Sequence, residues 1–160
     1  MNDVQVKTPE DRLKELGVHL PEGPPEPIGA FTNVRRAGDL LYVSGQGPVE
    51  ADGTLHVGKV GDDVTAEAAQ EHAQLVAVNI LAALKAHCGE LSRVTGVVKL
   101  LGLVNAHPDF ERHPFVIDGA SNLLAKAFGE AGVHSRSAFG VSSLPRRITV
   151  EIEAIFEIDS

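Results

Sequence analysis

The stretch "SRSAFGVSSLPRRITVEIEAIFEI", residues 135–158, decides the fold. From residue 148 onward, apolar and polar residues alternate, which is typical of a strand with one buried face. The residues expected on the buried face are Ile148, Val150, Ile152, Ala154 and Phe156, and those expected on the other face are Thr149, Glu151, Glu153, Ile155 and Glu157. The preceding residues 135–143 also favour a strand, and the Leu144-Pro145 turn predicts that the two strands pair as a hairpin.

The segments upstream complete an α+β pattern. Two strands are predicted at residues 30–37 and 40–45, joined by the favourable turn Gly38-Asp39. Thr65 is a good N-cap for a helix over residues 65–87, whose apolar residues recur at helical spacing. A Val- and Leu-rich strand is expected at residues 94–106 and a second helix from about residue 115 to 130. This order predicts one mixed sheet with both helices on the same face.

The second face of this sheet has no predicted helix to cover it. It would expose carboxylates beside apolar Leu and Val residues, and a half-apolar surface of this kind usually packs against another subunit. We therefore expect a homo-oligomer. The domain itself is predicted over residues 30–160, preceded in residues 1–29 by a short helix (residues 8–16) and a proline-rich arm (residues 21–29).

Composition excludes several classes of function. The chain has 160 residues and a formal net charge of −8, and its densest basic stretches are the pairs Arg35-Arg36 and Arg146-Arg147. Nucleic acid is therefore an unfavourable partner. A single cysteine, Cys88, fits a reducing compartment, and the absence of a long apolar run argues against a membrane span. These features predict a soluble, cytoplasmic protein.

The histidines and glycines match no established catalytic or metal-binding pattern. The seven histidines lack the spacing of a zinc site. The segment "SGQG" at residues 44–47 lacks the spacing of a dinucleotide-binding loop. His72 and His87 are expected on the surface of the first long helix. No metal or cofactor is predicted.

Arg136 and Glu151 allow two interpretations. In the predicted hairpin they lie nearly opposite each other, near its open end. One interpretation is a cross-strand ion pair, which stabilises an exposed hairpin only slightly. The other is a site in which the planar guanidinium of Arg136 binds a substrate carboxylate and Glu151 handles a water or a proton. The small neighbours Ser137, Ala138 and Gly140 leave room for a small ligand.

From about Pro27 onward, the chain resembles the RidA/YjgF family of reactive-intermediate deaminases. The matching segments are "PIGAF" (residues 27–31), "LLYVSGQGPV" (residues 40–49) with the Asp-Gly turn after it, and "SRSAFGVSSLP…VEIEAIFEI". The last segment is the most specific, because it combines Arg-Ser, a strand of small residues, Leu-Pro and a Glu-x-Glu strand at fixed spacing. The proline-rich arm and "GKVGDDVT" (residues 58–65) resemble a subgroup with an N-terminal extension.

The resemblance implies a chorismate-mutase-like fold and a homotrimer, with sheets packed inward, helices outward and small pockets between subunits. It also implies hydrolysis of small enamine or imine carboxylic acids, of the 2-aminoacrylate type, to keto acids and ammonia without a cofactor. By position, Arg136 would bind the substrate carboxylate and Glu151 would position water. Ser44 and Gly45 would contact the ligand through a hydroxyl and a backbone amide. Phe31 would line the substrate site at a position where the deaminases usually have a tyrosine.

Three positions depart from the family pattern. Phe31 lacks the tyrosine hydroxyl, Ala138 replaces a common cysteine, and Gly119 falls about where an asparagine often occurs. These departures leave a second function open, which is non-catalytic binding or sensing of a small keto-acid-like metabolite. A third function associated with such families, ribonuclease activity or inhibition of translation, is disfavoured by the acidic charge.

Overall fold

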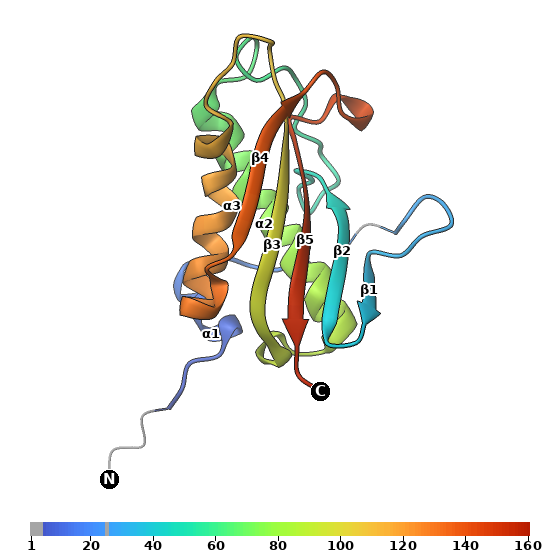
Figure 1. Ribbon diagram of the computed structural model, residues 1–160, viewed down its shortest axis with the longest axis vertical. Helices are drawn as coiled ribbons and strands as arrows, with labels where there is room; N and C mark the ends of the chain where they lie inside the picture. The colour runs from blue at the N-terminus through green and yellow to red at the C-terminus, as the bar shows by residue number, and fades with distance from the viewer. Residues whose placement is uncertain (1–4, 25) are drawn as a thin grey trace.

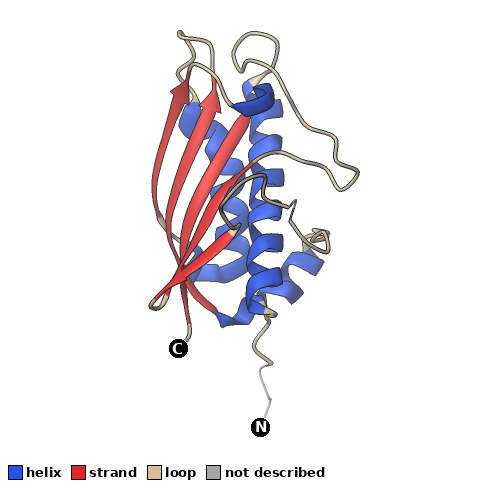
Figure 2. Ribbon diagram, turned by 90° about the vertical axis from the view of Figure 1, so that its right-hand side faces the viewer, coloured by secondary structure: helices blue, strands red, loops and turns tan. Residues whose placement is uncertain are grey.

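The computed structural model describes residues 5–24 and 26–160, so residues 1–4 and Pro25 of the predicted arm lie outside the described residues. A five-stranded sheet is backed by helices on one face (Figures 1 and 2). The helices are α1 (Pro9–Glu15), α2 (Ala66–Cys88) and α3 (His113–Phe128), with short 3₁₀ turns at Leu91–Arg93, Gly129–Gly132 and Pro145–Arg147. The strands are β1 (Val34–Ala37), β2 (Leu40–Gln46), β3 (Val94–Asn105), β4 (Ser135–Val141) and β5 (Val150–Ile158). The predicted α+β class with a mixed sheet is confirmed.

The strand order corrects the predicted hairpin. The order is β1-β2-β5-β3-β4, so β3 lies between the two C-terminal strands (Figure 1). Strand β4 pairs with β3 in parallel, whereas β5 pairs antiparallel with both β3 and β2. The reason is the crossover through α3. This helix carries the chain from the end of β3 back toward its start, so β4 then runs beside β3 in the same direction. The segment after β4 must then pass over the end of β3 before β5 begins.

The core forms between one face of the sheet and helices α2 and α3. Thr65 caps α2 as predicted, because its hydroxyl accepts a hydrogen bond from the amide of Ala68 at 3.1 Å. The predicted apolar stripe of α2 is fully buried, and so is the inward face of β5. The largest side chains at this interface include Ile80, Leu84, Leu100, Ile117, Leu124, Ile152 and Phe156. Thr149 departs from the predicted alternation, since it is completely buried just before β5 begins.

The predicted N-terminal helix forms as α1 and packs on the domain. Thr8 and Asp11 form a reciprocal capping box at its start. Leu13 is only 2% exposed and joins the main core. The carboxylate of Glu10 accepts a hydrogen bond from the amide of Leu91 at 2.7 Å, which fixes α1 to the turn after α2.

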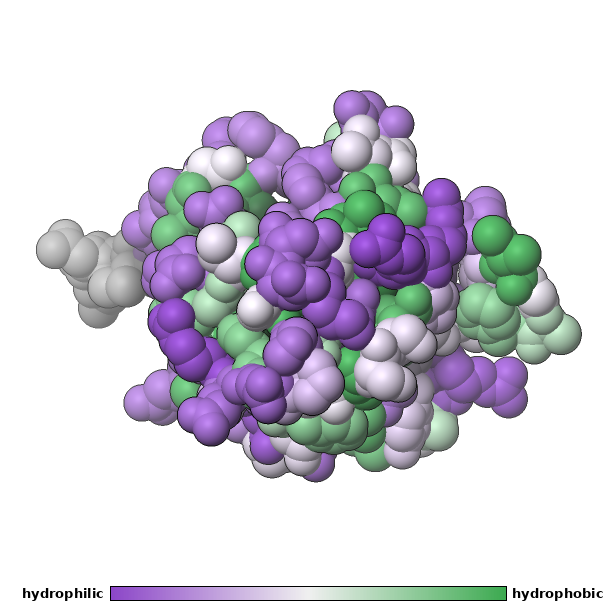
Figure 3. Space-filling model, turned by 90° about the horizontal axis from the view of Figure 1, so that it is seen from above, coloured by the Kyte–Doolittle hydropathy of each residue, from purple (hydrophilic) through white to green (hydrophobic). Residues whose placement is uncertain are grey.

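The second face of the sheet is open, as Figure 2 shows from the side. Its exposed apolar residues include Tyr42, Val98 and Phe139. The sheet therefore has two unlike faces, one inside the core and one available for packing. The loop end of the molecule is different again, because hydrophilic and hydrophobic residues are mixed over its visible surface (Figure 3).

Candidate functional site

Arg136 lies on the helix-facing side of the edge strand β4. Its register partner on β3 is Leu100, which is completely buried against the helices. Paired residues on neighbouring strands point to the same face, so the side chain of Arg136 is directed toward α3. There its Nη1 donates to Oδ1 of Asp118 at 2.8 Å and to Oγ of Ser121 at 3.1 Å. The Arg136 side chain remains 22% exposed.

A neutral histidine completes this group. Nδ1 of His134 lies 2.7 Å from the carbonyl oxygen of Gly132, and a carbonyl can only accept, so Nδ1 carries the proton. In the neutral ring Nε2 is then an acceptor, and it accepts a hydrogen bond from the Ser121 hydroxyl at 2.9 Å. Burial lowers the pKa of His134, and the charge of Arg136 lowers it further, against the opposing effect of the Gly132 hydrogen bond. Ser121 can therefore turn a lone pair toward Arg136 and hold it in place.

Glu151 lies on the opposite, open face of the sheet. Its register partner Leu103 also pairs with the exposed Phe139, whereas the neighbours of Glu151 on β5, Val150 and Ile152, are completely buried. Burial raises the pKa of Glu151, and the nearby carboxylate of Glu153 raises it further. A carboxyl group with a raised pKa is better suited to exchange protons near neutral pH.

Ser44 and Gly45 accompany Glu151 on this face. They lie where the β2–β5 register shifts between Val43 and Gln46. A Cβ on Gly45 would come within 3.0 Å of the carboxyl carbon of Glu151, so the absence of a side chain permits their contact. The Ser44 hydroxyl donates to the carbonyl of Thr32 at 2.7 Å, in the loop that also carries Phe31. Ser44, Gly45 and Glu151 are thus brought together.

The structure does not bring Arg136 and Glu151 together within one chain. Strand β3 separates their strands, and the two side chains lie on opposite faces of the sheet. The expected placement opposite each other in a hairpin is wrong, and so is the cross-strand ion pair. Any ligand contacted by both residues must lie between two chains.

The three departures from the family pattern occupy different places. Phe31 is 57% exposed in the loop next to Ser44. Ala138 lies two residues along β4 from Arg136, on the same face. Gly119 faces away from Arg136: a Cβ there would come within 2.0 Å of the carbonyl oxygen of Gln70 on α2. The side chains beside Arg136 are instead those of Asp118 and Ser121.

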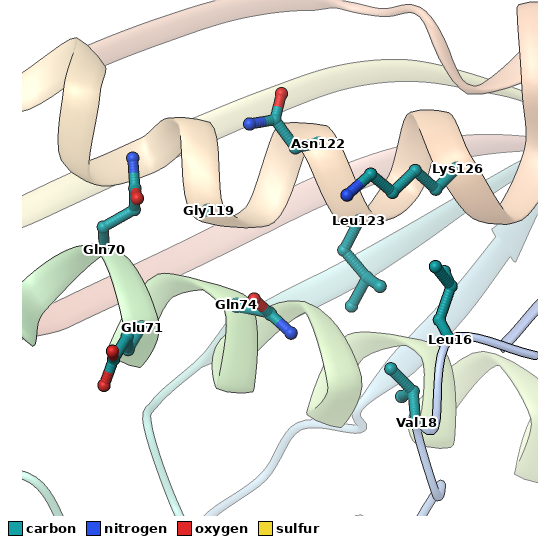
Figure 4. A pocket seen from close by; sticks show the side chains of 9 residues that line it. All are labelled: Leu16, Val18, Gln70, Glu71, Gln74, Gly119, Asn122, Leu123 and Lys126. Atoms are coloured by element: carbon teal, nitrogen blue, oxygen red, sulfur yellow. The ribbon is translucent and has the colours of Figure 1, made fainter. Parts of the chain in front are cut away.

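Of the hollows on the described surface, two lie near predicted site residues or near Gly119. The larger, about 740 Å³, lies on the open sheet face and is lined by Tyr42, Ser44, Leu101, Glu153 and Ile155, among others. The smaller, about 330 Å³, lies between α2 and α3 on the outer helical face and is lined by Gln74, Asn122 and Lys126, with Gly119 at the helix contact (Figure 4). Neither hollow includes Arg136 or Glu151 in its lining.

The described part of the chain carries few alternative sites. Within residues 5–24 and 26–160, no three His, Cys, Asp or Glu side chains are grouped so that they could hold a metal ion. Cys88 is buried, and burial raises the pKa of its thiol, which disfavours the reactive thiolate. No described helix is both long and apolar enough to cross a membrane.

Comparison with known proteins identifies the family to which the chain belongs. The family model "YjgF/chorismate_mutase-like, putative endoribonuclease" matches residues 10–153. Protein TCP17 of Trypanosoma cruzi is 36% identical over 149 residues, which cover 92% of each chain. A crystal structure of the Agrobacterium tumefaciens protein Atu1372, of unknown function, superposes with a TM-score of 0.88 at 47% identity and covers 94% of this chain and 92% of the other. A 2-iminobutanoate/2-iminopropanoate deaminase of Dermatophagoides farinae is 29% identical and covers 84% of this chain and 91% of its own.

The chain therefore belongs to the YjgF/RidA family and has the chorismate-mutase-like fold of that family. Both expectations from the sequence are confirmed.

Proposed function

We propose that the protein hydrolyses small enamine or imine carboxylic acids to keto acids and ammonia. The observation that supports this proposal is that only one nitrogen of the Arg136 guanidinium is hydrogen-bonded within the described chain. Its Nη1 is held by Asp118 and Ser121, while its Nε and Nη2 donate to no residue in the described part of the chain. The Nε and Nη2 edge of a guanidinium matches the two oxygens of a carboxylate. The family relative named as a deaminase of imino acids is consistent with that ligand.

The reaction needs an acid or base as well as a carboxylate anchor. Water adds to the electrophilic carbon of the imine, a proton moves to nitrogen, and ammonia leaves. Glu151 is suited to this transfer because burial and Glu153 raise its pKa. Positioned proton transfer of this kind contributes roughly 10²–10⁴-fold.

We further propose that the working site forms between chains of a homotrimer. Arg136 and Glu151 lie on opposite faces of one chain, so Arg136 of one copy must meet Ser44, Gly45 and Glu151 of the next. A head-to-tail contact of this type gives a closed ring when three copies are related by a threefold rotation axis, which is the arrangement proposed. The open sheet face, with Tyr42 exposed, supplies apolar surface for such packing.

The test measures keto-acid and ammonia release from freshly generated 2-aminoacrylate. Arg136→Ala should abolish the acceleration, and Glu151→Gln should reduce it by about 10²-fold or more. Arg146→Ala is the matched control, because Arg146 is an exposed arginine outside the proposed site. Equal rates in the native protein and Arg136→Ala would refute the proposal.

A second function is favoured by Phe31. Phe31 is exposed and has no hydroxyl, so the hydrogen bond that the resemblance implies for a tyrosine at this position is missing. The alternative is binding of a small keto-acid-like metabolite without turnover. It predicts ligand-dependent thermal stabilisation that disappears in Arg136→Ala, together with no acceleration of imine hydrolysis.

A further inference from the structure

Asp118 places a negative charge directly beside the proposed carboxylate anchor. Its Oδ1 accepts from Arg136 at 2.8 Å, and its side chain is 44% exposed. Oδ2 of Asp118 accepts no hydrogen bond from any residue that the structure describes. One carboxylate oxygen therefore holds the arginine, and the second is available to a ligand.

The pair has no net charge to attract a simple anion. Arg136 contributes one positive charge and Asp118 one negative charge, and the neutral His134 adds none. A ligand with only a carboxylate gains the free edge of Arg136 but lies close to the carboxylate of Asp118. A ligand with adjacent negative and positive groups can satisfy both partners.

We propose that Asp118 binds the positively charged nitrogen of the ligand, so that the Asp118–Arg136 pair binds zwitterionic 2-imino or 2-amino acids more tightly than keto acids. This inference rests on the proposed function, because it uses Arg136 as the carboxylate anchor. In a protonated 2-imino acid, the nitrogen is attached to the carbon next to the carboxylate. Its N–H groups can then donate to Oδ2 of Asp118 while the carboxylate binds Nε and Nη2 of Arg136.

The same arrangement favours release of the product. Hydrolysis replaces the charged nitrogen by a neutral keto oxygen, which can donate no hydrogen bond to Asp118. The lone pairs of that oxygen would face those of the carboxylate. A keto-acid product therefore binds more weakly than the substrate from which it forms.

Binding of two stable ligands with one carbon skeleton tests the inference without any reaction. Calorimetric titration compares 2-aminobutanoate, a zwitterion, with 2-oxobutanoate, a simple anion. The native protein should bind the amino acid more tightly, and Asp118→Asn should reverse the order by weakening the amino acid about tenfold and strengthening the keto acid. Asparagine retains an oxygen that can accept from Arg136, so the anchor stays oriented. Asp109→Asn is the matched control, because the Asp109 side chain is 93% exposed in a loop.

The outcomes separate this inference from the proposed function. If Asp118→Asn weakens both ligands equally, Asp118 only orients Arg136 and the inference is overturned. A native preference for 2-oxobutanoate overturns it as well. If the preference switches as expected but 2-aminoacrylate is not hydrolysed, the deaminase proposal fails and the ligand assignment stands. Ligand-free melting temperatures of the variants confirm that each one is folded.

Discussion

His72 should make the folded protein sensitive to mild acid. Contrary to the expectation of a free position on the helix surface, it is half-buried on α2 and its Nδ1 lies 2.9 Å from the hydroxyl of the buried Thr149. Its ring stacks on that of His56 with a centroid distance of 4.3 Å, and Nε2 of His56 lies 2.8 Å from the carboxylate of Glu50. Burial lowers the pKa of His72 to about 4, and His56 adds to the decrease while Glu50 opposes it.

The sign of the effect follows from proton binding. The pKa of His72 falls from 6.5 to about 4 on folding, so between these values the unfolded chain binds more protons than the folded one. Stability is therefore complete above about pH 6.5 and decreases as the pH falls toward about 4. At about 1.4 kcal/mol for each pH unit, the full difference is worth about 3 kcal/mol. Because His72 is only partly buried, solvent screening reduces this to about 2 kcal/mol.

Replacement by glutamine isolates this contribution. A glutamine side chain at this position would be uncharged at every pH yet able to reach the Thr149 hydroxyl, so His72→Gln should lose about 2 kcal/mol less stability than the native protein between about pH 7 and pH 4. Urea unfolding across this range, at one fixed protein concentration, measures the difference. His87→Gln is the control, since His87 is exposed near the end of the same helix. Parallel pH profiles for the native protein and His72→Gln would refute the reasoning.

Three further predictions concern assembly and packing. Co-refolding equal amounts of the inactive variants Arg136→Ala and Glu151→Gln should restore about one quarter of native deaminase activity, because random trimers regain that share of intact interfaces. If no activity is recovered, Arg136 and Glu151 of neighbouring chains do not form one shared site. Ile155→Lys, on the central strand of the open face, should reduce the mass seen by sedimentation from three chains to one. Gly119→Ala should destabilise the fold by about 2 kcal/mol or more, since its Cβ would meet a backbone oxygen of α2 at 2.0 Å, whereas Gly23→Ala meets nothing within 4 Å and should be neutral in urea unfolding.

Local patterns in the sequence predicted each helix and strand and most of the buried faces, although β1 begins at Val34 rather than at residue 30 and Thr149 is buried. The alternation after residue 148 placed Ile152 and Phe156 in the core, and both are completely buried. The same patterns could not give the strand order. Residues 135–143 and β5 are neighbours in sequence, which favours a hairpin, but the parallel pairing of β4 with β3 depends on the long crossover through α3. Such long-range pairing leaves no mark on local alternation.

The candidate site was predictable by residue type and not by arrangement. Arg136 stood out because its small neighbours leave room for a ligand beside the guanidinium, although an ion pair was an equally open interpretation. Its partners Asp118 and Ser121 were missed, although their i, i+3 spacing places them on one face of α3. That face acquires meaning only when β4 is known to lie beside it. The placement of Gly119 at a family asparagine position was likewise uninformative, because Gly119 serves the contact with α2.

The separation of Arg136 from Glu151 connects the two candidate functions. The ligand-binding half of the proposed site, formed by Arg136 and Asp118, is already assembled within a single chain. The proposed acid–base residue, Glu151, lies on the opposite face, and in the proposed trimer it would reach the same ligand from a second chain. Under this scheme an isolated chain binds a zwitterion without converting it, and association supplies Glu151 and turns binding into hydrolysis. Activity per chain should therefore fall on dilution in step with the loss of assembled rings, while binding of 2-aminobutanoate persists. If binding and activity are lost together at the same dilution, both halves of the site require the neighbouring chain.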